Sequence, residues 1–329
     1  VLKKAPGVRS PLATDGDYGE EQITVVDPSG FKVGGGVTIG YEHPGNFHTT
    51  VATIVAQIDD HTFAINRPLV DDYVVSRHAA AQTTFPVISG YHVEGVAVED
   101  LTIDGNRAHN PYLGGCRGGG VFLYRSHGTR LSRLRVHDYN GDGISYQQSH
   151  DVVVEDCVVT HCADKGLHPG SGSQRTVVRR CQLLENDKIG LFVCWRVRFS
   201  RFEACTIRGN GEVGVSIGHK DTDNVFTGNE IIENGRHGVL FRNEPEHLAA
   251  HRNRFEHNRI CDNGRDGEGC GIYVGGQTRD LVITGNTFAN TVRPPRQRYA
   301  IFVGAEAGPL QVDGNTMEGH EAEMHRASA

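Results

Sequence analysis

The chain has 329 residues, of which 22% are charged and 37% hydrophobic, and it carries 42 glycines and a formal net charge of -7. It has no run of 18 apolar residues, so the sequence predicts no membrane-spanning helix. The eight cysteines form no obvious disulfide framework, and the Cys and His residues lack the close pairs that bind zinc.

The first part of the chain is organised as short strands. From Gln22 to about Pro86, segments such as "GVTIG" and "TTVATIVAQI" alternate apolar and polar residues between Gly, Asp and Pro turns, without a longer repeat. We predict a small antiparallel β-module over residues 1–88 that caps the next domain, since an open solenoid end exposes unpaired backbone groups. The Gly-rich loop 107–120, which carries Tyr112, is either a flap beside a groove or a plain connector.

The rest of the chain repeats itself every 23 or 24 residues. The glycines that open the copies are Gly120, Gly143, Gly166, Gly190, Gly214 and Gly238. The first and third residues after each glycine are apolar, and two further short apolar runs complete each copy. Three short strands in each stacked unit predict a parallel β-helix over residues 89–329.

Polar and small residues recur in columns along the copies. One predicted column contains Cys157, Cys181, Cys205, Asn229, Asn253, Asn286 and Asn315, and a second contains Asn186, Asn210 and Asn234. Stacking brings equivalent residues to about 4.8 Å from each other, so neighbouring amides can hydrogen-bond along a ladder. We interpret both columns as structural.

Copies such as "GVSIGHKDTDNVFTGNEIIENGR" and "HGVLFRNE" resemble the pectate-lyase-like right-handed parallel β-helix superfamily, in particular its carbohydrate-binding and sugar-hydrolase repeat proteins, over about residues 92 to 320. The resemblance implies an all-β chain, a polysaccharide or oligosaccharide partner, and a secreted or periplasmic location. The stretch "GLHPGSGSQRTVVRRCQLLEN" looks distantly like the region around the Asp-Pro-His motif of alginate C5-epimerases. The order Leu167-His168-Pro169-Gly170 does not reproduce the acid and histidine of that motif.

Function in such a fold is expected on outward side chains of one strand column, because the inward ones form the core. The copies between Gly166 and Glu244 gather most of the chemistry-bearing residues. The candidate catalytic residues are His168, His219, Lys220, Arg242 and Glu244, and the candidate substrate-binding residues are Tyr146, Lys165, Trp195, Arg196 and Asn243. This strip is mostly basic although the chain is acidic, which favours a negatively charged sugar chain. It has too few cations and aromatic rings for a nucleic-acid groove.

These residues favour a polysaccharide lyase that acts by β-elimination on a uronic-acid-containing glycan. Arg242 or Arg196 would bind the substrate carboxylate, Lys220 or His168 would be the base, and His219 the acid.

Two alternatives remain open from the sequence. A glycoside hydrolase needs paired carboxylates, for which Asp142 with Asp164, or Glu212 with Glu244, are candidates. A non-catalytic carbohydrate-binding or tailspike-like solenoid would use the same groove without a catalytic pair.

No cofactor is firmly predicted. The segment "DYNGDG" (138–143) resembles the start of a Ca²⁺ loop, but its twelfth position is Ser149 and not Glu.

Overall fold

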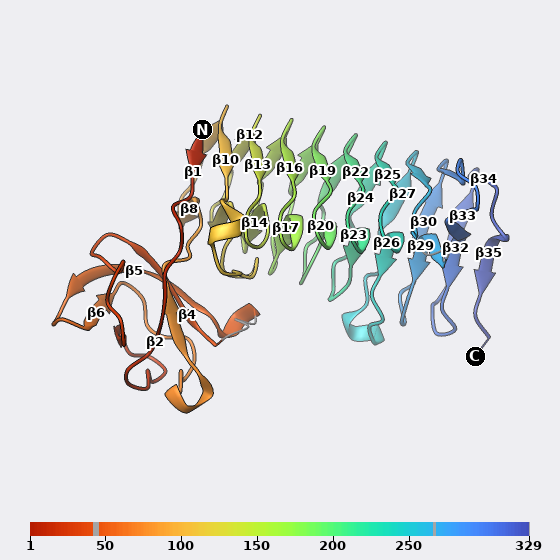
Figure 1. The fold of residues 1–329 in the computed structure, drawn as a ribbon. Coiled ribbons are helices and arrows are strands. Elements are labelled where there is room, and N and C mark those ends of the chain that lie inside the picture. Colours follow the sequence, from red (N-terminus) through yellow and green to blue (C-terminus); the bar gives the residue numbers. More distant parts are fainter. Residues whose placement is uncertain (42–45, 266–267, 329) are drawn as a thin grey trace.

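The computed structural model describes residues 1–41, 46–265 and 268–328. The chain is all-β, with a right-handed parallel β-helix and a small antiparallel module at its N-terminal end, as the sequence predicts (Figure 1). Within the described residues, no helix has the length and apolar character needed to cross a membrane.

Each turn of the β-helix adds one strand to each of three parallel sheets. Among the described residues, sheet 1 contains β8 (Ile88–Tyr91), β11 (Val121–Tyr124), β14 (Ile144–Gln147), β17 (Lys165–Gly170), β20 (Ile189–Phe192), β23 (Val213–Ile217), β26 (His237–Phe241), β29 (Gly269–Val274), β32 (Gln297–Val303) and β35 (Ala322–Arg326). Sheet 2 contains β9 (Ala97–Glu99), β12 (Arg130–Ser132), β15 (Val153–Glu155), β18 (Val177–Arg179), β21 (Arg201–Glu203), β24 (Val225–Thr227), β27 (Arg254–Glu256), β30 (Leu281–Thr284) and β33 (Leu310–Asp313). Sheet 3 contains β1 (Leu2–Lys3), β10 (Thr102–Asp104), β13 (Arg135–His137), β16 (Val158–Thr160), β19 (Gln182–Leu184), β22 (Thr206–Arg208), β25 (Glu230–Ile232), β28 (Arg259–Cys261), β31 (Thr287–Ala289) and β34 (Thr316–Glu318).

The register of sheet 1 follows the glycine period. Ser145 pairs with His168, and Phe192 pairs with Ser216, so the second residue after each opening glycine forms one column. The first and third residues point inward, and the core they form is continuous from turn to turn. Each buried Val, Leu or Ile side chain contributes about 1.5–3 kcal/mol relative to an exposed one.

The amide ladders agree with the sequence except at one position. Asn186 donates to Asn210 at 3.0 Å and Asn210 donates to Asn234 at 2.9 Å, which confirms the second column. In the first column, the residue that follows Asn229 is Asn258, not Asn253, at 2.9 Å.

The correction has a simple cause. The turn between β26 and β27 is longer than the equivalent turn between β23 and β24 and contains η4 (Glu246–Leu248). The partner of Asn229 is therefore 29 residues ahead instead of 24. Asn253 instead accepts from Asn224 at 3.1 Å, in a third ladder.

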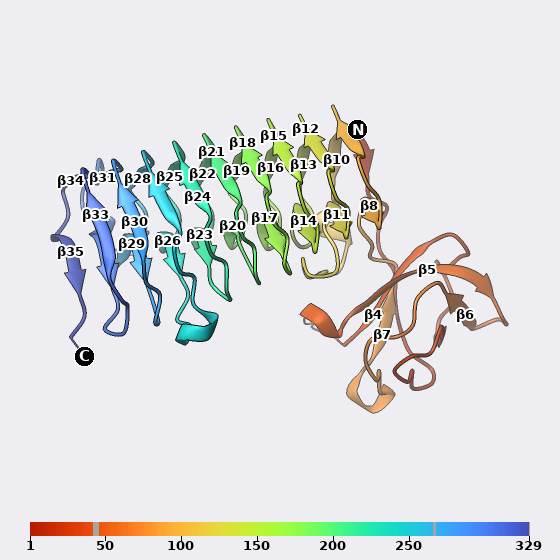
Figure 2. The same ribbon diagram turned by 180° about the vertical axis from the view of Figure 1, so that it is seen from behind.

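The N-terminal module has an antiparallel sheet and its own core. Its strands, in sheet order, are β2 (Arg9–Pro11), β7 (Ala80–Gln82), β4 (Gly36–Gly40), β5 (Thr50–Gln57), β6 (Thr62–Ile65) and β3 (Gln22–Thr24), and short 3₁₀ segments are η1 (Asn46–His48) and η2 (Val75–Arg77). Figures 1 and 2 show the module beside the first turns of the β-helix, at the end opposite the C-terminus.

The first strand of the chain lies apart from the module that the sequence predicts over residues 1–88. Leu2 pairs with Ile103 through β1 and β10, so the first residues of the chain belong to sheet 3 and not to the module. A further short 3₁₀ segment, η3 (Arg107–His109), opens the Gly-rich loop 107–120.

Candidate functional site

A buried acid–histidine pair forms the centre of the candidate site. Asp142 directly precedes the glycine that opens β14, and His168 occupies the second position of the next copy in β17. Asp142 Oδ2 lies 2.8 Å from His168 Nδ1, and the two side chains are 0% and 2% exposed. Among the described residues, His168 Nε2 has no hydrogen-bond partner.

The surroundings of this pair fix its protonation. Burial lowers the pKa of His168 below its ordinary value, and the Asp142 carboxylate offsets this only in part. Burial pushes the pKa of Asp142 upward, but Lys165 and His168 together hold it below its ordinary value. The pair therefore consists of a carboxylate and a neutral imidazole near neutral pH. Because the carboxylate can only accept, His168 Nδ1 carries the proton and donates it to Asp142, and Nε2 is left as a hydrogen-bond acceptor.

A second carboxylate and a lysine extend the cluster. Lys165 Nζ lies 2.6 Å from Asp164 Oδ2 and 3.5 Å from Asp142 Oδ1. Burial lowers the pKa of Lys165, but the two carboxylates outweigh burial and raise it above its ordinary value. Asp164 also accepts a hydrogen bond of 2.5 Å from the Tyr112 hydroxyl, whose pKa is raised by burial and by that carboxylate.

The Gly-rich loop 107–120 covers this cluster, as expected for a flap. Ser145 Oγ donates to the carbonyl of Gly115 at 2.6 Å. A side chain at Gly115 would overlap the Asp142 carboxylate, so only glycine permits this close cover. Arg117 donates to the carbonyl of Phe47 at 2.8 Å, which ties the flap to the N-terminal module.

The Phe192 ring joins this cluster to a second group of residues. The His168 ring meets it edge-on at 4.9 Å between centroids, and Lys165 Nζ lies 5.0 Å from its centroid. On the same ring, Arg242 Cζ lies 4.9 Å from the centroid. The structure therefore gathers His168 and Lys165 of β17 and Arg242, which follows β26, around one aromatic side chain.

Arg242 is held by neighbours that orient its guanidinium. It donates to Ser216 Oγ at 2.9 Å, to the carbonyl of Val193 at 3.1 Å and to Asp221 Oδ2 at 3.3 Å. Its Nε is buried and has no hydrogen-bond partner among the described residues.

Asp221 is a site residue that sequence reasoning missed. The "GHKDTDN" segment indicates turn formers, and Asp221 does accept from the backbone N–H of Val197 at 2.9 Å and of Gly218 at 3.1 Å. It is also the buried partner of Arg242. Burial raises the pKa of Asp221 to about 7, against the opposing effect of Arg242.

His219 and Glu244 lie next to Arg242, and Trp195 contacts His219. His219 Nδ1 is 2.8 Å from Glu244 Oε1, although without hydrogen-bond geometry, and Glu244 Oε1 is 4.0 Å from Arg242 Nε. The His219 ring stacks on Trp195 at 5.0 Å, and Phe47 of the module contacts the same indole at 5.3 Å. Burial lowers the pKa of His219, with Glu244 opposing and Arg242 reinforcing this shift.

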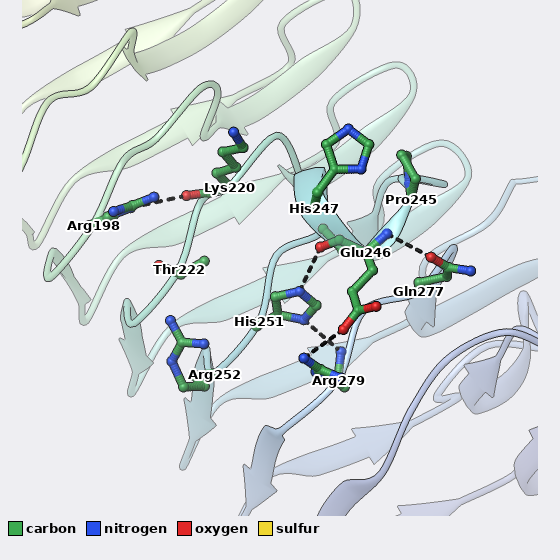
Figure 3. A pocket seen from close by; sticks show the side chains of 11 residues that line it. Arg198, Lys220, Thr222, Pro245, Glu246, His247, His251, Arg252, Gln277 and Arg279 are labelled. Carbon is green, nitrogen blue, oxygen red and sulfur yellow. Dashed lines mark hydrogen bonds and ion pairs between the residues drawn. The ribbon is translucent and has the colours of Figure 1, made fainter.

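Three predicted residues lie outside this cluster. Lys220 lines a separate pocket of about 770 Å³ together with residues that include Arg198 and Arg279 (Figure 3). Arg196 is exposed in another groove, beside Arg125 and His150, and Asn243 is exposed.

The prediction for Tyr146 is wrong. Its side chain is 0% exposed and belongs to the hydrophobic core, because the third residue after each opening glycine points inward. The strip is also less basic than the sequence indicates, since Asp142, Asp164 and Asp221 are paired with its cations.

The segment 138–143 does not gather its oxygens as a Ca²⁺ loop would. Asp138 lies 2.8 Å from His137, Asn140 Oδ1 accepts from Lys4 at 2.9 Å, and Asp142 faces His168. Within the described ranges, no group of three or more His, Cys, Asp or Glu side chains is arranged to hold a metal ion.

The fold and this cluster define a right-handed parallel β-helix with a covered polar site on sheet 1. A family model described as "Right handed beta helix region" matches residues 84–231 and 120–288, and the chain belongs to this family. No curated protein matches the sequence.

Two solved structures from Azotobacter vinelandii share the fold. The A-module of mannuronan C-5 epimerase AlgE6 is 17% identical with a TM-score of 0.59, and 74% of each chain is covered. The A-module of mannuronan C-5 epimerase AlgE4 is 16% identical with a TM-score of 0.54, over 74% of this chain and 78% of that one.

Proposed function

We propose that the protein is a carbohydrate-active enzyme that acts on an acidic polysaccharide, by removing the proton α to a uronate carboxylate. In the reaction we favour, β-elimination then breaks the glycosidic bond, as in a polysaccharide lyase. The observation that carries the proposal is the buried Asp142–His168 pair, whose histidine presents an unpartnered Nε2 beside cations.

His168 has the properties of a general base. Its Nδ1 is fixed by a carboxylate, and its lowered pKa keeps the imidazole neutral near neutral pH. A base within hydrogen-bond reach of the proton contributes about 10²–10⁴-fold to the rate. This replaces Lys220, which lies in the other pocket.

Arg242 has the properties of a carboxylate binder. Its buried Nε is unpartnered among the described residues, and the rest of its guanidinium is held in place by Ser216 and Asp221. A fixed guanidinium offsets the charge that develops on a substrate carboxylate as the α proton leaves.

The acid in this proposal is Tyr112 and not His219. Burial and Asp164 raise the pKa of Tyr112, so its hydroxyl is protonated but is a weaker acid than an ordinary tyrosine. The leaving glycosidic oxygen must take the place of Asp164 Oδ2, which accepts this proton at 2.5 Å. The lowered pKa of His219 leaves that imidazole without the proton an acid needs.

A hydrolase that uses Asp142 and Asp164 has less support. Such an enzyme needs one protonated carboxylic acid. Both of these carboxylates bind the Lys165 ammonium, and the pKa of Asp142 is lowered.

C5-epimerisation of a uronate is a second candidate, because the two solved structures described above, which share the fold with many others, are mannuronan C-5 epimerases. It begins with the same proton abstraction and differs in that the proton is returned to the opposite face of the sugar.

The test is incubation with mannuronan and other uronic-acid polysaccharides. New ultraviolet absorbance from an unsaturated product supports elimination, whereas deuterium uptake from heavy water at C5 without chain cleavage supports epimerisation. New reducing ends without unsaturation would overturn the proposal in favour of a hydrolase. Binding without any of these reactions would identify a non-catalytic carbohydrate-binding solenoid.

A further inference from the structure

A small cavity lies where the N-terminal module meets the first turns of the β-helix. Its volume is about 230 Å³, below the range of about 300–1,000 Å³ that is typical of drug-sized ligands. The lining includes Thr49 and Arg67 of the module, Arg117 of the flap, and Tyr91, Phe122 and Tyr124 of sheet 1. The cavity therefore has room for one sugar residue, and three separate parts of the chain build it.

Two polar groups in the lining lack partners within the protein. Thr49 is 2% exposed, and its hydroxyl has no hydrogen-bond partner among the described residues. Arg117 Nε is likewise buried without a partner, although the same guanidinium donates to Phe47. Burying an unsatisfied polar group destabilises a protein, so two such groups at one cavity point to a ligand that satisfies them.

The other wall is aromatic and carries a second cation. Tyr91 contacts Phe122 at 5.7 Å and Tyr124 at 6.3 Å between ring centroids. Arg67 Cζ lies 3.7 Å above the Tyr91 ring. Because Arg67 covers one face of the Tyr91 ring, a sugar ring would pack against the other aromatic side chains of the lining, and the guanidinium groups would bind a carboxylate.

The position of the cavity relates it to His168. Phe122 pairs with Ser145, and Ser145 pairs with His168, so the cavity wall is two turns from the candidate base along the same column. Adjacent turns are about 4.8 Å apart, so the separation along the sheet is about 10 Å. The module closes the cavity on its far side through Thr50 and Val51 of β5.

We infer that this cavity is a subsite for the terminal residue of an acidic glycan, with the uronate carboxylate at Arg117 and Arg67 and a sugar hydroxyl at Thr49. The inference rests on the proposed function and deepens it, because a chain that ends against the module is processed from its end. The products are then short, with one or two sugar residues released at each event.

The test measures binding of sodium glucuronate, glucose and inorganic phosphate by calorimetry, without any reaction. Glucuronate is expected to bind at least about tenfold more tightly than either glucose or phosphate, because only glucuronate offers both a carboxylate and a sugar ring. Thr49→Val and Arg117→Gln are each expected to weaken glucuronate binding by about tenfold or more.

Matched variants separate this subsite from the catalytic proposal. Arg77→Gln removes a guanidinium that lies 4.4 Å from the Tyr41 ring in the same module, away from the cavity lining, and should leave binding unchanged. His168→Gln should lower turnover by about 10²–10⁴-fold and leave glucuronate binding intact. Equal binding of glucuronate and glucose, or full binding by Thr49→Val and Arg117→Gln, would overturn the subsite even in an active enzyme.

Discussion

The imidazole of His168 and the carboxylate of Asp142 lie 2.8 Å apart and are separated by 26 residues of sequence. The pair forms because the β-helix stacks consecutive copies, which places an acid at the start of one turn beside a histidine in the next. The local order Leu167-His168-Pro169-Gly170 lacks an acid next to the histidine, and the neighbouring turn supplies it.

Loss of His168 should remove activity without unfolding the protein. His168→Gln is expected to lower kcat by about 10²–10⁴-fold, because the general base is gone. Steady-state rates on the active polysaccharide and a thermal melt measure the two effects. His161→Gln, a change at an exposed histidine paired with Glu185, is the control and should keep full activity. A fully active His168→Gln would exclude this residue as the base.

Arg242 should affect both activity and stability. Arg242→Lys cannot reproduce the fork of hydrogen bonds to Ser216, Val193 and Asp221, so kcat/KM should fall by at least about tenfold. Arg242→Ala leaves the buried Asp221 unpaired, which is expected to cost about 3–5 kcal/mol of unfolding free energy.

The Arg242→Ala variant should be more sensitive to pH on the alkaline side. Burial already raises the pKa of Asp221 to about 7 from its ordinary value of 3.8. A carboxyl with a raised pKa favours the folded state below the ordinary value, and this stability is lost as pH rises through the folded value. Denaturant melts should show that Arg242→Ala lowers the free energy of unfolding, relative to the unsubstituted protein, by more at about pH 8 than at about pH 5. Arg252→Ala is the control: this arginine is half-exposed and its partner Asp223 is partly exposed, so the loss of unfolding free energy should stay near about 0–1 kcal/mol.

His237 should make the fold less stable in acid. It is buried, its Nδ1 accepts from the backbone N–H of Cys270 at 3.1 Å, and burial lowers its pKa to about 4 from 6.5. A histidine with a lowered pKa contributes stability that is present above the ordinary value and is lost as pH falls toward the folded value. Between pH values equal to these two pKa values, protonation of His237 should lower the free energy of unfolding by about 3 kcal/mol. His237→Gln should flatten the stability profile in that window; an unchanged profile would contradict the assignment.

The asparagine ladder should stabilise the middle of the β-helix more than its end. Asn210 accepts from the backbone N–H of Asn186 and donates to Leu183 and Asn234, all in the interior. Asn210→Ala leaves these groups unpaired and should cost about 2–5 kcal/mol. Asn315→Ala, at the partly exposed end of a ladder, should cost about 1 kcal/mol. Urea unfolding compares the two, and equal losses would contradict the interpretation.

Much of the fold could be predicted because the evidence for it is local. The alternation after each glycine fixes which side chains point inward, and the period of 23 or 24 residues fixes which residues stack. Asn186, Asn210 and Asn234 followed directly from this period, whereas the longer turn before Asn258 broke it and misplaced Asn253. Tyr146 is the third residue after Gly143, a position that the alternation places in the core, so its assignment to substrate binding went against the pattern.

The sequence by itself determined the β-helix, its register and the column on which His168 lies. Only the tertiary structure decided that Asp142 is the partner of His168, that Asp221 holds Arg242, and that the flap covers the site and is tied to the module. The physical reason is that a strand's side-chain direction depends on its own alternation, whereas contacts at turns and under loops depend on backbone paths of segments that are distant in sequence.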